Sequence, residues 1–160
     1  MTKGINKYLF LLILLFVWQF YACNKSLIYT DSADIPGEVW ALDYVPVFEP
    51  FITDTINSNN IYLTIRNSTA YPFRNIWLFV TTTSPAGKSI TDTLQYMLAD
   101  EKGKWYGKGF GDIHELNLPF RTSVYFPIKG KYSFKIRHGM RSENLKGIYD
   151  IGLRIERVKN

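Results

Sequence analysis

The only cysteine of the chain, Cys23, occupies a position where a lipid-modified residue is expected. It follows the small residue Ala22 at the end of an apolar run that begins at Tyr8 and contains one polar side chain, Gln19. A thiolate is the nucleophile that can accept a diacylglyceryl group, and a secretory cleavage site requires a small residue before it. We therefore predict that Cys23 carries lipid, including a palmitate-type acyl chain, although the large Tyr21 departs from the usual cleavage pattern.

The two histidines are the next candidates for chemistry. Asp112, His114 and Glu115 together offer ligands for a metal or an acid–base pair, although three polar residues in a glycine-rich linker also form an ordinary solvated turn. His138 follows a regular strand pattern, where a histidine commonly bonds a neighbouring backbone carbonyl; the alternative places it on a binding surface with Arg141. No motif for a nucleophile, phosphate, zinc or dinucleotide is present, so we expect no catalytic site, no metal and no cofactor. A carboxylate pair of a hydrolase stays open as an alternative, since no spacing selects one.

Aromatic side chains are the other candidates for function. In the run 76–80, Ile76, Leu78 and Val80 take one face of a strand and leave Trp77 and Phe79 on the other. Such a strand is either covered on both faces or exposes an apolar patch to a partner. We name Trp77, Phe79, His138 and Arg141 as the candidate binding surface.

Three tryptophans, Trp40, Trp77 and Trp105, remain after the N-terminal segment is removed. Exposed tryptophans on a β-protein stack on sugar rings, which makes carbohydrate binding the alternative function. Core filling is the competing interpretation of the same residues. A platform of coplanar, exposed aromatic side chains would distinguish the two.

These residues lie in a chain with a clear division at Cys23. Lys3 and Lys7 followed by the apolar run have the layout of a signal peptide, and the run is short for a permanent transmembrane helix. The alternative is an uncleaved anchor that ends in a buried, unmodified Cys23. We expect a signal peptide over 1–22, a lipidated tether over 23–37 and one domain over 38–160. Cleavage removes both lysines, which lowers the net charge from +5 to +3. That charge is too small to indicate nucleic-acid binding.

The domain is built of short runs with period-two alternation, which predicts β-strands. The clearest strands are expected over 61–66, 76–81, 131–137 and 149–156, and weaker ones over 38–48, 91–98, 105–109 and 122–128. A short helical turn is expected over 112–119. The absence of any long amphipathic helical pattern favours an all-β fold, an antiparallel β-sandwich or jelly roll in a single domain.

The C-terminal third carries a recognisable order of motifs. Residues 126–134 (FPIKGKYSF), 137–141 (RHGMR) and 145–156 (LKGIYDIGLRIE) resemble the gliding-motility lipoprotein GldH family of Bacteroidetes-type bacteria. Earlier pieces fit in the same order: 67–73 (NSTAYPF), 84–88 (SPAGK), 92–94 (DTL) and 105–112 (WYGKGFGD). The resemblance covers essentially the whole chain after the signal peptide.

This resemblance implies a non-enzymatic envelope lipoprotein that takes part in gliding and in the associated secretion machinery. The expected partners are other envelope lipoproteins or motility and secretion proteins, with the membrane bound through the lipid on Cys23. No catalytic residue follows from the resemblance. The residues after Cys23 contain no acidic cluster of the kind that directs some lipoproteins to the cell surface, so we expect the protein to face the periplasm.

Overall fold

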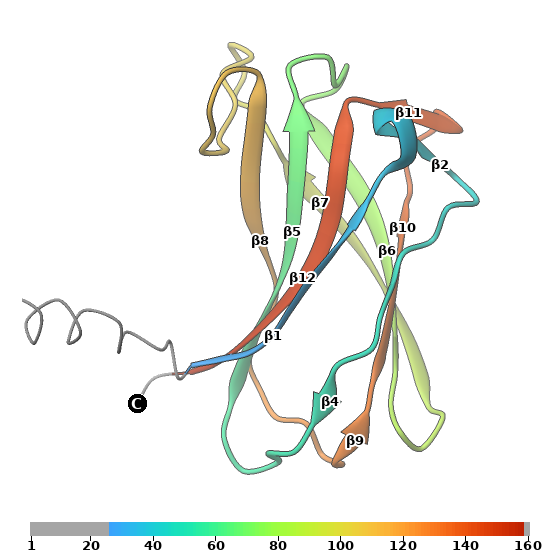
Figure 1. The fold of residues 1–160 in the computed structure, drawn as a ribbon, viewed down its shortest axis with the longest axis vertical. Coiled ribbons are helices and arrows are strands. Elements are labelled where there is room, and N and C mark those ends of the chain that lie inside the picture. The colour runs from blue at the N-terminus through green and yellow to red at the C-terminus, as the bar shows by residue number, and fades with distance from the viewer. Residues whose placement is uncertain (1–25, 159–160) are drawn as a thin grey trace, which may run out of the picture.

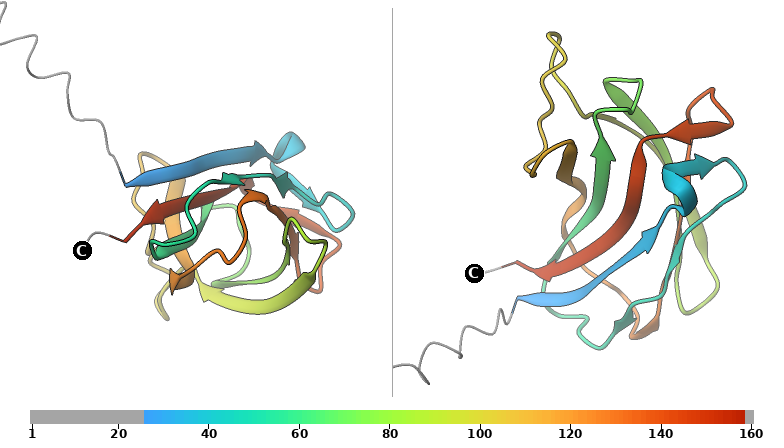
Figure 2. Two further views of the ribbon diagram at one scale, coloured as in Figure 1. Left: turned by 90° about the horizontal axis from the view of Figure 1, so that it is seen from below. Right: turned by 45° about the horizontal axis from the view of Figure 1, so that its top comes forward.

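A computed structural model describes residues 26–158, which form two four-stranded antiparallel sheets packed face to face (Figures 1 and 2). The first sheet has the order β1-β12-β5-β8, and these strands are Leu27–Asp34, Ile148–Arg157, Asn59–Ser68 and Ile113–Val124. The second has the order β3-β10-β6-β7, and these strands are Val47–Phe48, Ser133–His138, Asn75–Thr83 and Ser89–Met97. The predicted antiparallel β-sandwich is thereby confirmed.

Short elements close the two ends of the sandwich. At the upper end in Figure 1, the 3-10 turn η2 (Pro36–Glu38) leads into β2 (Val39–Ala41), which pairs with β11 (Asn144–Lys146). At the lower end, β4 (Phe51–Ile52) pairs with β9 (Gly130–Lys131). The predicted signal peptide and lipidation site, Cys23, fall in residues 1–25, which lie outside the described residues, as do residues 159–160.

The core between the sheets follows from the alternation in the sequence. Successive side chains of a strand point to opposite faces, so every second apolar residue enters the core. The inward residues of β5, β6, β10 and β12 are at most 3% exposed: Ile61, Leu63, Ile65, Ile76, Leu78, Val80, Phe134, Ile136, Ile151, Leu153 and Ile155. These strands contain the four clearest predicted runs, which the structure confirms with only small changes of boundary.

Of the weaker predicted strands, some are confirmed and others differ from the structure. The run 91–98 is β7, whereas 38–48 forms two short strands, β2 and β3, and only the start of 122–128 belongs to a strand. The run 105–109 makes isolated bridges, Ala99 with Trp105 and Lys108 with Glu115, instead of a strand. The helical turn expected over 112–119 is wrong, because these residues open the twelve-residue strand β8.

The expected tether over 23–37 is also wrong over most of its length. Strand β1 pairs with β12 from Leu27 opposite Glu156 to Asp34 opposite Asp150, and Ile35 after it is 4% exposed. β1 is an edge strand with polar groups on most positions, so its sequence lacks the apolar alternation that identifies a buried strand. The folded domain therefore begins close to Cys23.

Candidate functional site

The three residues proposed as metal ligands do not come together. His114 stacks on Trp105, with ring centroids 5.7 Å apart and planes at 22°, and its Nε2 is buried without a hydrogen-bond partner in the described chain. Glu115 is the next residue of β8 and points to the opposite face, while Asp112 is exposed in the preceding loop. Within residues 26–158 no three histidine, cysteine or acidic side chains are grouped as a metal site requires.

His138 does not belong to an exposed surface. Its side chain is 0% exposed and contacts Trp40 edge-on, with ring centroids 5.4 Å apart and planes at 72°. Neither ring nitrogen makes a hydrogen bond of normal geometry with a described residue, and the backbone group that acts on the imidazole is that of Trp40. Burial lowers the pKa of His138; the backbone of Trp40 partly opposes this, and the charge of Arg137 adds to it. The imidazole is therefore a neutral core group.

Trp77 and Phe79 do share a face on the outside of the second sheet. Trp77 is 38% exposed and Phe79 is half-buried. The guanidinium of Arg137, opposite Phe79 on β10, lies 5.1 Å from the Phe79 ring centroid, which is a cation–π arrangement. We call Trp77, Phe79 and Arg137 the aromatic surface.

The turn after β10 shapes this surface. A Cβ on Gly139 would lie 2.7 Å from the Phe79 ring, so the glycine leaves the space that the ring occupies. The Trp77 backbone N–H donates to the Met140 sulfur at 3.3 Å. Arg141 is exposed after this turn, but the arginine over Phe79 is Arg137. Alternation from Phe134 and Ile136 predicts the outward position of Arg137, but the sequence interpretation chose Arg141 for the binding surface.

The three tryptophans do not form a sugar-stacking platform. Trp40 is 0% exposed in the core, where its Nε1–H donates to the Tyr44 carbonyl at 2.8 Å. Trp105 is half-buried between Tyr71 and His114, whereas Trp77 lies on the outer sheet face. The coplanar arrangement expected for carbohydrate binding through these residues is therefore absent.

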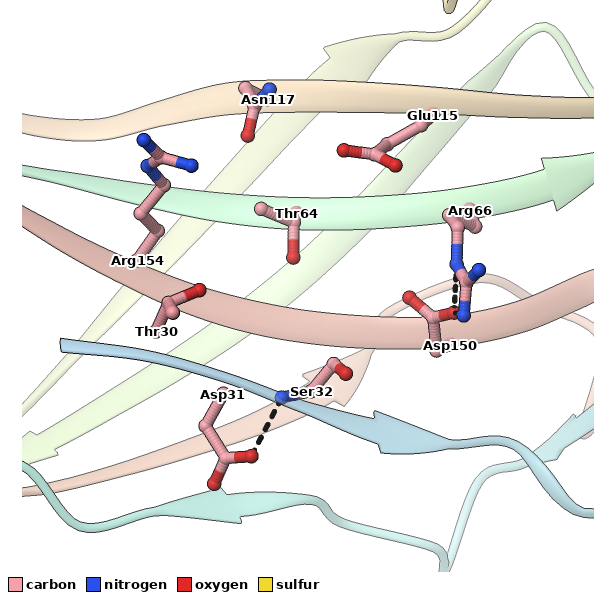
Figure 3. Close-up of a pocket in the computed structure, with 9 residues that line it drawn as sticks. All are labelled: Thr30, Asp31, Ser32, Thr64, Arg66, Glu115, Asn117, Asp150 and Arg154. Atoms are coloured by element: carbon pink, nitrogen blue, oxygen red, sulfur yellow. Dashed lines mark hydrogen bonds and ion pairs between the residues drawn. The ribbon is translucent and has the colours of Figure 1, made fainter. Parts of the chain in front are cut away.

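The first sheet carries a polar hollow of about 400 Å³ on its outer face (Figure 3). Gly152 lets two lining residues of the hollow pack closely: a Cβ at Gly152 would lie 2.3 Å from the Thr64 hydroxyl and 3.3 Å from the Ser32 Cβ. Four strands supply its lining, which consists of Thr30, Asp31, Ser32, Thr64, Arg66, Glu115, Asn117, Asp150 and Arg154. We call these nine residues the polar hollow.

One carboxylate in the hollow is almost completely withdrawn from water. The Asp150 side chain is 4% exposed and pairs with the half-exposed Arg66 of the neighbouring strand. Burial raises the pKa of Asp150 above its usual value, and the hydrogen bond and charge of Arg66 oppose that rise. The hollow thus presents fixed donors and acceptors to a polar ligand. Its lining contains no histidine, so its hydroxyl groups have no neighbouring imidazole base.

The predicted lipid on Cys23 lies outside the described residues, so the structure does not test it. Within residues 26–158, no helix has the length and apolar character needed to cross a bilayer.

Comparison with known proteins gives consistent results over nearly the whole chain. A family model described as GldH lipoprotein matches residues 27–155. The chain is 34% identical over 148 residues to a protein of Christiangramia forsetii named gliding motility lipoprotein GldH homolog, covering 88% of this chain and 90% of that protein. It is also 34% identical over 143 residues to the gliding motility lipoprotein GldH of Flavobacterium johnsoniae, covering 85% and 88%.

Proposed function

The chain belongs to the GldH lipoprotein family, and we propose that it is a lipid-anchored, non-enzymatic component of the gliding and associated secretion machinery that binds other envelope proteins. The observation that carries this proposal is the similarity, over most of both chains, to proteins named gliding motility lipoproteins. In this proposal, lipid on Cys23 anchors the domain to a membrane and the domain faces the periplasm.

The aromatic surface is the proposed contact with a protein partner. Tryptophan and arginine contribute disproportionately to binding energy at protein interfaces, because they bury a large area or satisfy several hydrogen bonds. Trp77 lies two residues before Phe79 on β6, Arg137 lies opposite Phe79 on β10, and Trp77 keeps 38% of its surface exposed. A partner that covers this patch would bury apolar area that now faces water.

A pull-down from detergent-solubilised envelopes tests this function. The wild-type protein, Trp77→Ala, Cys23→Ala and Tyr106→Ala would serve as bait, with bound proteins identified by mass spectrometry. Tyr106 is a matched control, since it is a 60% exposed aromatic residue in the loop between β7 and β8 and is not part of the aromatic surface. Truncation of a residue central to an interface weakens binding by about tenfold or more.

We expect motility or secretion proteins to be recovered with wild type and Tyr106→Ala, and to be lost with Trp77→Ala. Loss with Cys23→Ala would show that the assembly requires the lipid anchor. Equal recovery with Trp77→Ala would contradict the assignment of the aromatic surface, and recovery of no such protein with wild type would contradict the function.

The polar hollow supports carbohydrate binding as a second candidate function. Its Asn117, Arg66 and Asp150 side chains are the hydrogen-bonding groups that sugar hydroxyls require, and they lie in a hollow of about 400 Å³. A glycan array probed with wild type and Asn117→Ala tests this candidate. Binding that the substitution abolishes would support it, whereas a wild-type protein that binds no glycan would exclude the glycans tested.

A further inference from the structure

The chain enters the folded domain at one end of the sandwich. The Ser26 carbonyl accepts a hydrogen bond from the Arg157 N–H at 2.7 Å, and Arg157 lies opposite Asn59 on β5. Asn59 in turn lies opposite Val124, the last residue of β8. Residues 26, 157, 59 and 124 therefore form one row across the first sheet. Arg157 in this row pairs with Asp54, which follows β4 in the loop at the lower end of Figure 1.

The distance from this row to the proposed lipid anchor is short. Three residue steps separate Cys23 from Ser26, and an extended chain spans at most about 3.6 Å per residue, so the gap is at most about 11 Å. A bilayer headgroup layer has a comparable thickness. If Cys23 carries lipid, as the proposed function requires, the lower end of the sandwich lies against the bilayer.

This end exposes large apolar side chains from separate segments. Phe51 of β4 is 68% exposed, and Ile56, in the loop before β5, is 83% exposed. Tyr125 and Ile128, in the loop between β8 and β9, are 63% and 42% exposed. Exposed apolar residues that gather at one end mark a contact site more strongly than the same residues scattered over a surface.

The loop that presents Ile56 is held in place. Asp54 accepts hydrogen bonds from the Ile56 and Asn57 N–H groups at 2.9 and 3.1 Å, and its carboxylate also pairs with Arg157 at 2.8 Å. The side-chain bond from Asn57, the two backbone bonds and the Arg157 charge lower the pKa of Asp54 to about 2. The exposed position of Ile56 is therefore a fixed feature of a folded loop.

Lysines accompany the apolar residues at this end. Lys88 in the β6–β7 turn and Lys129 before β9 make no ion pair with a described residue, whereas Lys131 pairs with Glu49 at 3.2 Å. Apolar side chains beside free ammonium groups are the combination that binds the headgroup region, where rings and aliphatic groups enter the interface and lysines meet phosphates.

An apolar groove of about 610 Å³ opens at the same end, between β7 and β8. Ile90, Tyr125 and Ile128 are exposed along it. We propose that the lower end of the sandwich, defined by Phe51, Ile56, Tyr125, Ile128, Lys88 and Lys129, is a membrane-contact surface that lies on the leaflet holding the lipid of Cys23. This inference rests on the proposed lipid anchor and adds an orientation: the domain stands on its lower end, and the upper end points away from the bilayer.

Fluorescent labelling of the lipidated protein tests the orientation. Because the chain has one cysteine and its sulfur is blocked by lipid, an introduced cysteine is the only free thiol. Ile56→Cys and Phe110→Cys would each be labelled with an environment-sensitive dye and reconstituted into vesicles of phosphatidylethanolamine and phosphatidylglycerol. Phe110 is the matched control, since it is 96% exposed in the loop before β8 at the upper end.

We expect both proteins to float with the vesicles, and the label at position 56 to be quenched several-fold more than the label at 110 by lipids carrying a quencher in the headgroup region. Adding Lys88→Glu and Lys129→Glu should reduce that difference, whereas Lys135→Glu on the outer face of β10 should not. Flotation with equal quenching at both positions would overturn the membrane-contact surface and leave the lipid anchor intact.

Two further outcomes would also overturn the inference. Failure to float would contradict the lipid anchor itself, and with it the orientation. A blue shift in the emission of the dye at position 56, without quenching of that dye by the lipids, would indicate that a protein partner or a second copy of the chain covers this end.

Discussion

Replacing His138 by leucine tests whether this residue is a core group or part of a binding surface. The folded protein holds His138 buried and neutral, and burial lowers its pKa below the ordinary value of 6.5. Below pH 6.5 the unfolded chain therefore binds a proton that the folded protein resists, so stability falls as the pH falls. Leucine has nearly the same volume as histidine and no titrating group, so it removes this dependence.

The size of the effect follows from the pH range. Each pH unit below 6.5 lowers the free energy of unfolding by up to about 1.4 kcal/mol for one proton, so the loss at pH 5.0 is at most about 2 kcal/mol. The substitution itself conserves volume and should change stability at pH 7.5 by less than about 1.5 kcal/mol. For each protein, the change in the free energy of unfolding from pH 7.5 to pH 5.0 is measured. The difference between the wild type and His138→Leu in this change tests the prediction.

Urea denaturation followed by tryptophan fluorescence at the two pH values measures this difference. We expect the wild type to lose more stability than His138→Leu on acidification, and the variant to retain partner binding in the pull-down. The same loss in both proteins would refute the buried neutral imidazole. Loss of partner binding in a stably folded His138→Leu protein would show that His138 contributes to the binding surface.

Three other substitutions test contacts in the sandwich. Arg66→Met leaves the buried Asp150 carboxylate unpaired and should lower the free energy of unfolding by about 2 kcal/mol. This loss is smaller than the loss expected on breaking a fully buried pair, because Arg66 is half-exposed. Urea denaturation measures it, and an unchanged midpoint would contradict the prediction. Gly147→Ala should cost more than about 2 kcal/mol in the same assay, because Gly147 has φ +80° and the new Cβ would lie 2.5 Å from the Tyr71 nitrogen. Tyr96→Phe removes the hydrogen bond from the Tyr96 hydroxyl to the Pro119 carbonyl at 2.8 Å, which joins the two sheets, and should cost about 1 kcal/mol. Burial, together with the charge of Asp92, raises the pKa of Tyr96 to about 12, so alkaline ultraviolet titration of the wild type should show one more late-ionising tyrosine than titration of Tyr96→Phe.

The inner faces of the strands were predictable because alternation is a local property. In the predicted strand over 131–137, alternation places Tyr132, Phe134 and Ile136 on one face, and all three are at most 4% exposed. The same alternation, carried one step further, places His138 inside and Arg137 outside. The interpretation of His138 as a residue beyond the strand end was wrong, because β10 continues through position 138.

The polar hollow was not predictable from local patterns. Arg66 and Asp150 are 84 positions apart in sequence and meet only because β5 and β12 are neighbours in register. The close packing at Gly152 depends on β1 pairing with β12, and β1 itself was interpreted as a tether. Contacts of this kind require the strand order, which the alternation does not specify.

The glycine-rich segment before β8 misled the prediction in a different way. Residues 105–109 have the alternation of a strand but make only isolated bridges, and the strand begins at Ile113. β8 contains Pro119, and it is an edge strand, where proline is tolerated because its missing N–H is not needed for pairing.

The central claim is that a membrane-anchored domain of this family contacts motility or secretion proteins through the aromatic surface. A photo-crosslinking amino acid placed at position 77 in living cells tests this most directly, with position 106 as the control. The account predicts a crosslinked adduct with a motility or secretion protein at position 77 and not at position 106. No adduct at position 77, or the same adducts at both positions, would contradict it.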